Sequence, residues 1–471
     1  MKLINSFRKK KEEKNLMSKE KRTHSKNTEG NKSGVIFDPT KVKEFYPFKY
    51  GQIVFGGYFG DEGKGKEVDI IAEDYKLKGL KVLSIRGQGS GNAGHTVVAD
   101  GVRYDFHYLT SAGLLADTML LGPGMLIDPI RVLEEAKKLP KDKRNCILVA
   151  ERAAIVTELD RAMDEWCENE RTNSGQAIIG TTKSGVGPGA GNRGYRVHVT
   201  FADARNCIDE KELKKLFLKN PLYPKEVKKL MTDEYSKELW KAIKKINVVS
   251  SEAVIEDCRQ EGDWAVLLEI SQAVCLDPLF GNGGHFTTST PCTNIGGATG
   301  AGLTLKDFPD GSVMVLKAYG SKVGGGPFIT KFSEKEKKVG EFIYDIVGEK
   351  GVTTGRKRDL GWFDGPAVRH SIALTGAEKI CINCMDVISK LSDVTDKVKI
   401  CFAYKNIETD EVTYDWPYDL SEWEPLYLEI PLEKNKPNKN VKKYIKMIEK
   451  VIGKKIHGYG VGPSRMDFRL R

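Results

Sequence analysis

The sequence contains no run of about 18 consecutive apolar residues, so no segment is expected to span a membrane. It also lacks the apolar core of a secretory signal, because Phe7 is followed at once by Arg8 and three lysines. No repeat of fixed period and no coiled-coil pattern is present. With 471 residues, 40% of them apolar and 30% charged, the chain has the composition of a globular protein with a sizeable core.

Cysteine is sparse and odd in number. Nine cysteines are scattered along the chain, which is typical of reduced thiols, and we therefore expect a cytoplasmic protein. Cys381 and Cys384 form one CxxC pair, but a zinc ribbon needs a second pair. The segment 379–386 is typical of a buried strand and its end, which favours a structural role over a redox role for this pair.

Positive charge is concentrated at the N-terminus. The first 49 residues hold 14 Lys or Arg and 6 Asp or Glu, which accounts for 8 of the 10 net positive charges. We interpret residues 1–48 as a basic, disordered extension and residues 49–471 as the folded domain. The extension alone could bind RNA or anionic lipid, but a solvated tail is the simpler interpretation. The nearly neutral body argues against nucleic-acid binding.

Short apolar segments alternate with glycine-rich loops and helical patterns from residue 51 onward. This alternation predicts βαβ units, and hence an α/β fold with a large, mainly parallel central sheet. Lys, Glu and Leu recur at helical spacing within 208–262, which predicts an inserted helical segment. The expected strands are 52–55, 81–85, 119–121, 146–149, 264–269, 313–316 and 379–382.

The most informative loop is Gly60-Asp-Glu-Gly-Lys-Gly-Lys66, which follows the first expected strand and precedes a helix. Its GxxxxGK spacing is that of a phosphate-binding loop, in which backbone N–H groups and a helix N-terminus attract an anion. The Ser or Thr that usually follows is replaced by Glu67. A carboxylate near a phosphate site needs a metal or a proton-transfer role, so Asp61 is a candidate metal ligand and general base. The alternative is an ordinary helix N-terminus with acidic residues in its first turn.

This loop and six further blocks, in the same order, resemble the adenylosuccinate synthetase family from about residue 51 to the end. The blocks are 92–96 (NAGHT), 180–188 (GTTKSGVGP), 269–300 (from Glu269 and Gln272 to GGATG), 316–328 (LKAY to VGGGPF), 353–369 (TTGRKR, GW and AVR) and 462–465 (GPSR). In that family a nucleoside monophosphate is phosphorylated on its 6-oxygen by GTP, and aspartate then displaces the phosphate. The resemblance therefore implies a ligase of purine nucleotide biosynthesis that forms a C–N bond and works as a homodimer.

The resemblance also implies roles for particular residues. Asp61 would remove the N1 proton and, with the Gly94 carbonyl, bind Mg²⁺, while His95 would assist departure of the γ-phosphate. Asp61, His95, Lys64 and Gln272 are the implied catalytic residues. The implied monophosphate site comprises Asp61, Glu62, Gly63, Lys64, Asn92, Ala93, Gly94, His95, Thr182, Arg193, Gln272, Thr287 and Arg356. The implied GTP site comprises Gly60, Asp61, Glu62, Gly63, Lys64, Gly65, Lys66, Gly94, His95, Thr96, Arg358, Cys384, Met385, Asp386, Gly460, Val461 and Gly462. The implied aspartate site comprises Val352, Thr353, Thr354, Gly355, Arg356, Lys357 and Arg358.

Several positions depart from the family pattern. Cys384 stands where a lysine usually precedes the base-reading Asp386, and Lys183-Ser184 replaces an arginine in the third loop. Arg193 or Asn192 would be the residue that a partner subunit donates. Because the departures fall on substrate loops, three alternatives stay open: a relative that acts on GMP or dGMP, possibly with ATP as donor; a non-catalytic nucleotide-binding protein; and an RNA-binding protein that uses the basic tail.

Overall fold

The computed structural model describes residues 46–99, 101–281, 285–349 and 357–471. The extension predicted over 1–48 lies almost wholly outside these residues, as do Val352, Thr353, Thr354, Gly355 and Arg356 of the predicted aspartate site. The predictions made for them therefore stay predictions. Among the described helices, none combines the length and apolar character needed to cross a bilayer.

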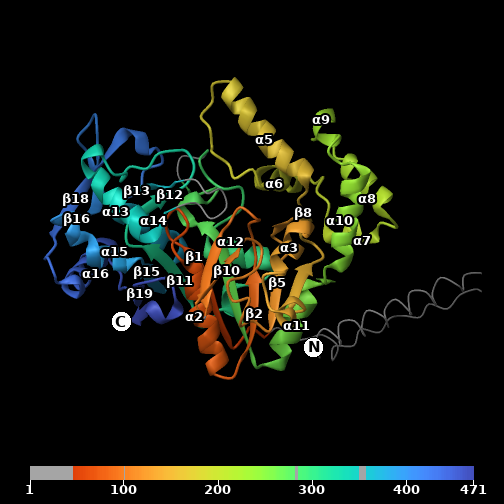
Figure 1. Cartoon of the computed structure of the whole chain (residues 1–471), viewed down its shortest axis with the longest axis horizontal. Coiled ribbons are helices and arrows are strands. Elements are labelled where there is room, and N and C mark those ends of the chain that lie inside the picture. Colours follow the sequence, from red (N-terminus) through yellow and green to blue (C-terminus); the bar gives the residue numbers. More distant parts are fainter. Residues whose placement is uncertain (1–45, 100, 282–284, 350–356) are drawn as a thin grey trace, which may run out of the picture. The chain divides into compact units, whose positions relative to one another are not determined.

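The described part of the chain is built around a ten-stranded sheet (Figure 1). Nine strands are parallel, and the last pairs antiparallel with its neighbour. The seven expected strand segments all fall in this sheet, which confirms the predicted mainly parallel architecture. Across the sheet the strands are β20 (Phe468–Leu470), β19 (Gly458–Gly460), β15 (Lys379–Asn383), β11 (Ser312–Lys317), β1 (Tyr50–Gly56), β10 (Trp264–Ala273), β2 (Lys81–Arg86), β5 (Thr118–Leu121), β7 (Ile147–Ala150) and β9 (Val248–Val249).

The sheet brings distant polar residues to one edge. Strand β1 is almost entirely buried and pairs with β10 on one side and β11 on the other. Because all three strands run in the same direction, their carboxyl ends lie together, which is where ligands bind in open α/β sheets. The loop after β1 turns sharply through Gly60 and Gly63, whose φ angles of 89° and 88° suit glycine, and helix α2 (Lys64–Leu77) follows.

The segment 208–262 is largely helical. It contains α8 (Glu210–Leu218), α9 (Lys225–Lys228), α10 (Asp233–Lys245) and α11 (Ser251–Glu261), and it also supplies the edge strand β9. The apolar sides of α8 and α10 bury Leu213, Leu239 and Ile243 in a core that includes Phe201. Figure 1 shows α8, α9 and α10, in yellow-green, to the right of β5.

A smaller sheet follows β13 (Asp359–Gly361) in the chain. It consists of β14 (Phe363–Asp364), β16 (Lys397–Asn406), β17 (Val412–Thr413) and β18 (Trp423–Pro431). Helix α14 (Gly365–Thr375) packs on β16 of this sheet and on helix α16 (Pro437–Ile452). A hairpin of β3 (His95–Ala99) and β4 (Val102–Phe106) packs on α2. Neither the small sheet nor the hairpin was expected from the sequence.

Candidate active site

Two cavities open at the carboxyl edge of the central sheet. The large cavity has a volume of about 570 Å³ and the small cavity a volume of about 320 Å³. Four residues line both cavities: Asp61, Lys64, Gly94 and His95. The strand-end loop after β1 and the start of β3 therefore form a wall between two binding spaces.

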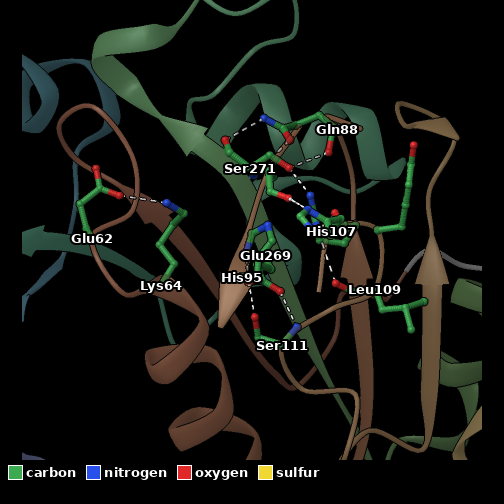
Figure 2. Close-up of polar contacts among 12 residues, drawn as sticks. Glu62, Lys64, Gln88, His95, His107, Leu109, Ser111, Glu269 and Ser271 are labelled. Atoms are coloured by element: carbon green, nitrogen blue, oxygen red, sulfur yellow. Dashed lines mark hydrogen bonds and ion pairs between the residues drawn. The ribbon is translucent and has the colours of Figure 1, made fainter. Parts of the chain in front are cut away.

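The loop after β1 is held by its own carboxylate. Glu62 is buried, and its Oε1 accepts hydrogen bonds from the N–H groups of Tyr58 (3.2 Å) and Gly60 (2.8 Å). Its Oε2 accepts a 2.9 Å bond from Lys64 Nζ (Figure 2). Glu62 lines neither cavity, and its side-chain bonds shape the loop, so its predicted place in the nucleotide sites stays a prediction.

Asp61 is exposed to ligands because its backbone is left-handed, with φ of 58°. Its carboxylate is 30% exposed, and its Oδ2 lies 2.6 Å from Arg358 Nη2. Arg358 Nη1 donates to Glu349 Oε2 at 2.5 Å. Burial works to lower the pKa of Arg358, but Asp61 and Glu349 outweigh it and raise that pKa. Asp61 is therefore paired with a guanidinium that Glu349 holds from its other side.

His95 is positioned by an acid on a neighbouring strand. Its Nδ1 lies 2.6 Å from Glu269 Oε1, and both side chains are almost completely buried (Figure 2). Glu269 also accepts bonds from Ser111 N (2.7 Å) and Ser111 Oγ (2.6 Å). Burial alone would raise the pKa of Glu269, but His95, Arg86 and Ser111 lower it to about 2. An ionised Glu269 fixes Nδ1 as the protonated nitrogen of His95.

The other ring nitrogen of His95 is available for a ligand. Burial lowers the pKa of His95, which favours the neutral imidazole. Its buried Nε2 has no hydrogen-bond partner among the described residues. Since His95 lines both cavities, an anion bound beside Nε2 would raise the pKa of the ring and supply a proton donor there.

Strand β10 ends in a second unusual backbone position. Gln272 has φ of 57°, lines the large cavity, and its buried Nε2 has no partner among the described residues. The preceding Ser271 donates its N–H to Gln88 Oε1 (3.1 Å) and accepts a short bond from the fully buried Arg86 (Figure 2). The bonds of Ser271 thus hold the end of β10, and Gln272 presents an unpaired amide N–H to the large cavity.

The small cavity ends at the start of helix α15 (Met385–Lys390). Cys384 precedes this helix with φ of 61°, and Asp386 lies in its first turn. Lys66 Nζ, on the same cavity, donates to the Gly462 carbonyl at 3.1 Å. Burial raises the pKa of Cys384, which disfavours the thiolate that redox chemistry needs. The CxxC pair is thus a buried strand residue and a helix-start residue, as the structural interpretation requires.

The predicted site residues separate into three groups. The monophosphate candidates that line the large cavity are Asp61, Lys64, Asn92, Ala93, Gly94, His95, Thr182, Gln272 and Thr287. The GTP candidates that line the small cavity are Asp61, Gly63, Lys64, Gly65, Lys66, Gly94, His95, Thr96, Arg358, Cys384, Asp386 and Gly462. Gly60, a GTP candidate, lines the large cavity instead, and the candidates that line neither cavity are Glu62, Arg193, Lys357, Met385, Gly460 and Val461.

Two members of the last group have clear structural positions. Arg193 donates hydrogen bonds to the carbonyls of Pro123, Gly124 and Met125 at 3.0–3.1 Å. That Arg193 reaches the active site of a partner subunit stays a prediction, and it requires these bonds to break. A Cβ on Gly460 would lie 2.0 Å from Lys66 Nζ. Glycine at this position therefore leaves room for the lysine on the small cavity.

Several residues of the site were not assigned a role from sequence. Glu269 pairs with His95 from 174 positions away, and Glu349 pairs with Arg358 and Lys317. One signal was available for Glu269, because a single acid within the apolar strand Trp264–Ala273 is rarely buried without a partner. Glu349 gave no comparable signal.

The sheet, the glycine-rich loop and the two cavities together indicate a class of protein. A mainly parallel sheet ends in a glycine-rich loop, and two adjoining cavities share a carboxylate, a lysine and an imidazole. Such a site can bind two ligands side by side and transfer a group between them, with anion-binding N–H groups at the wall. The class is therefore a nucleotide-dependent group-transfer enzyme.

Comparison with known proteins identifies the family. The adenylosuccinate synthetase family model matches residues 53–469. The adenylosuccinate synthetase of Acetivibrio thermocellus is 33% identical over 445 residues, covering 88% of this chain and 98% of that protein. That of Brachyspira hyodysenteriae is 34% identical over 436 residues, with 88% and 97% covered.

Solved structures give the same fold. Fully ligated adenylosuccinate synthetase from Plasmodium falciparum superposes with a TM-score of 0.78 at 26% identity, covering 89% of this chain and 99% of that chain. Cyanophage S-2L succinoaminodeoxyadenylate synthetase, bound to dGMP and dATP, superposes with a TM-score of 0.57 at 18% identity, covering 90% and 95%. The chain belongs to the adenylosuccinate synthetase family, whose members are ligases that form a C–N bond.

Proposed function

We propose that this protein converts IMP, L-aspartate and GTP to adenylosuccinate, GDP and phosphate. The observation that supports it most directly is Asp61, which lies on the wall shared by the two cavities. In the proposed arrangement, IMP occupies the large cavity and GTP the small cavity. The purine 6-oxygen and the γ-phosphate then meet at this wall.

The first step joins the two nucleotides. Asp61 accepts the N1 proton of IMP, so the 6-oxygen becomes nucleophilic and attacks the γ-phosphorus while the bond to GDP breaks. His95 presents Nε2 to the transferring phosphate, and Glu269 stabilises the imidazolium that forms. Gln272 offers its unused amide donor to the bound nucleotide.

The second step uses aspartate as the nucleophile. Its amine attacks C6, phosphate leaves with the electrons of the C6–O bond, and the amine loses a proton. Arg358 belongs to the predicted aspartate site and lines the small cavity. Its buried Nε has no partner among the described residues. A guanidinium donor of this kind suits a carboxylate of the amino acid.

The site fits a bound Mg²⁺ that is held mainly by substrate oxygens. Within the described residues no group of three or more acidic, His or Cys side chains is arranged as a metal centre. Mg²⁺ is commonly bound by one or two protein oxygens together with phosphates and water, and Asp61 and the Gly94 carbonyl are hard oxygen ligands on the shared wall. When bound there, the ion would neutralise charge on the transferring phosphate.

The decisive experiment tests acceptor and donor separately. Purified protein is incubated with Mg²⁺, aspartate, one of IMP, GMP or dGMP, and either GTP or ATP, and the products are identified by mass spectrometry. We expect adenylosuccinate from IMP and GTP, with Asp61→Asn as the inactive control. A succinyl product from dGMP or GMP but not from IMP would replace the proposed substrate. No product in any arm would favour a nucleotide-binding protein without this activity.

A further inference from the structure

Glu349 is a buried carboxylate that gathers four donors from separate parts of the chain. It follows helix α13 (Lys337–Val347) and is only 1% exposed. Oε1 accepts from Lys317 Nζ at 2.9 Å and forms a short bond with the Tyr319 hydroxyl. Oε2 accepts from Arg358 Nη1 at 2.5 Å and from Ser321 Oγ at 3.3 Å. No candidate role from sequence uses this residue.

Glu349 lines the small cavity and does not line the large one. Glu349, Lys317 and Arg358 all line the small cavity, and none of them lines the large cavity. Lys317 ends β11, where it pairs in register with Asn383 at the end of β15, directly before Cys384. Glu349 therefore fixes a lysine beside the position at which Cys384 replaces the usual lysine.

Glu349 also fixes the plane of the Arg358 guanidinium. The two terminal nitrogens of Arg358 are used by two carboxylates, Nη1 by Glu349 and Nη2 by Asp61. The Arg358 backbone N–H donates to the Glu349 carbonyl at 3.2 Å as well. The buried Nε is the guanidinium nitrogen that has no partner among the described residues. A planar guanidinium that is held at both terminal nitrogens presents its Nε–H in a fixed direction.

Glu349 is the ionised acid between two cations, Lys317 and Arg358. Burial by itself would raise the pKa of Glu349, but Lys317 and Arg358 outweigh it and lower the pKa to about 2. If the carboxylate were neutral, two cations would share a desolvated site with no anion between them. Such a site is strongly unfavourable, so the side chains would rearrange.

We propose that Glu349 is a positioning residue, which orients Lys317 toward the donor nucleotide and Arg358 toward aspartate and Asp61. The proposal rests on the proposed function, because it takes the small cavity as the donor site and Arg358 as an aspartate ligand. Glu349 acts through Lys317 and Arg358 and does not contact the reacting atoms itself.

The test is Glu349→Gln, which keeps the shape of the side chain and removes its charge. We expect the KM values for GTP and aspartate to rise at least about tenfold, in line with the loss of charged hydrogen bonds, while the KM for IMP changes less than twofold. The matched control is Asp307→Asn. Asp307 is a fully buried carboxylate bonded to Arg259 at 2.8 Å, and it lines neither cavity. This control should lower the melting temperature and leave all three KM values unchanged.

The outcomes separate a positioning role from a structural one. Unchanged KM values with a lower melting temperature or a smaller active fraction would overturn the proposal, as would an equal rise in all three KM values. If Glu349→Gln does not fold, Glu349→Asp keeps the charge on a shorter side chain, and it should raise the same two KM values by a smaller factor. The measurements start from the substrates that the wild-type protein is found to use. If the proposed IMP reaction is wrong, the wild-type assay shows it before any variant is measured. That result can therefore be told apart from a failure of the role proposed for Glu349.

Discussion

Glu67 gives a quantitative test of how burial controls charge beside the phosphate loop. It lies in the first turn of α2, is 2% exposed, and its Oε1 has no hydrogen-bond partner among the described residues. Burial raises its pKa from 4.5 to about 7, although Lys66, Asn383 and Cys381 act in the opposite direction. The position that usually carries Ser or Thr in a phosphate loop thus holds an acid that is protonated below neutral pH.

The sign and size of the effect follow from linkage. The folded state binds the Glu67 proton more tightly than the unfolded state, so the stabilisation from that proton is fully present below pH 4.5. It is lost as the pH rises through about 7. A difference of about 2.5 pH units at ~1.4 kcal/mol each corresponds to about 3 kcal/mol. Glu67→Gln keeps a neutral side chain of similar shape at every pH. We therefore expect it to exceed the wild type in free energy of unfolding by about 3 kcal/mol at pH 8.5 and to differ little at pH 4.5.

Urea unfolding followed by tryptophan fluorescence at several pH values measures this difference directly. The control is Glu336→Gln. Burial would raise the pKa of Glu336, but Lys399, Trp362 and Ser333 lower it to about 2. Its stabilising contribution is present above pH 4.5 and is lost as the pH falls, so this variant should be less stable than the wild type at pH 8.5, with the gap narrowing in acid. If the gap between Glu67→Gln and the wild type is the same at both pH values, burial does not shift the titration of Glu67 and the reasoning is wrong.

Three further predictions concern catalysis, the N-terminus and the donor. Asp61→Asn and His95→Asn should each lower turnover at least about 100-fold with the fold retained; near-normal turnover in either folded variant would remove that residue from the mechanism. Deleting residues 1–33 should leave turnover and melting temperature nearly unchanged, and a large drop in melting temperature would mean that the segment packs on the body. An ionised Asp386 can accept both N1–H and N2–H of guanine, so GTP should be preferred over ATP by roughly ten- to a hundred-fold, and Asp386→Ala should lose the preference. Equal use of both donors by the wild type would show that Asp386 does not read the base.

The central sheet was predictable because its strands are short apolar runs between glycine-rich loops. The strand Lys397–Asn406 was not predicted, since it alternates charged and buried residues within a sheet that is partly exposed. The hairpin from His95 to Phe106 was also missed, because its strands carry charged and polar side chains. Such strands form through tertiary packing, and local pattern alone does not specify them.

The glycine loop and His95 were predictable as site residues because their spacing is local. The acids that pair with the site residues were not predictable from sequence. Glu269 reaches His95 from another strand, and Glu349 pairs with Arg358 and with Lys317, which ends β11, so these pairings are created only by the fold. The existence of two cavities on either side of Asp61 likewise follows from the order of strands in the sheet, which sequence motifs do not encode.

The central place of β1 has a consequence for synthesis on the ribosome. Its two neighbours are β10, which begins at residue 264, and β11, which begins at residue 312. At roughly 5–20 residues per second, the 255 residues between the end of β1 and the start of β11 take roughly 13–50 s to translate. Until residue 273 this apolar strand has neither of its final hydrogen-bonding partners complete, and until β11 is made one edge of β1 stays open and can pair with other chains. Chains that stop before residue 312 should therefore aggregate rather than form a small nucleotide-binding unit, even though they contain the whole phosphate loop.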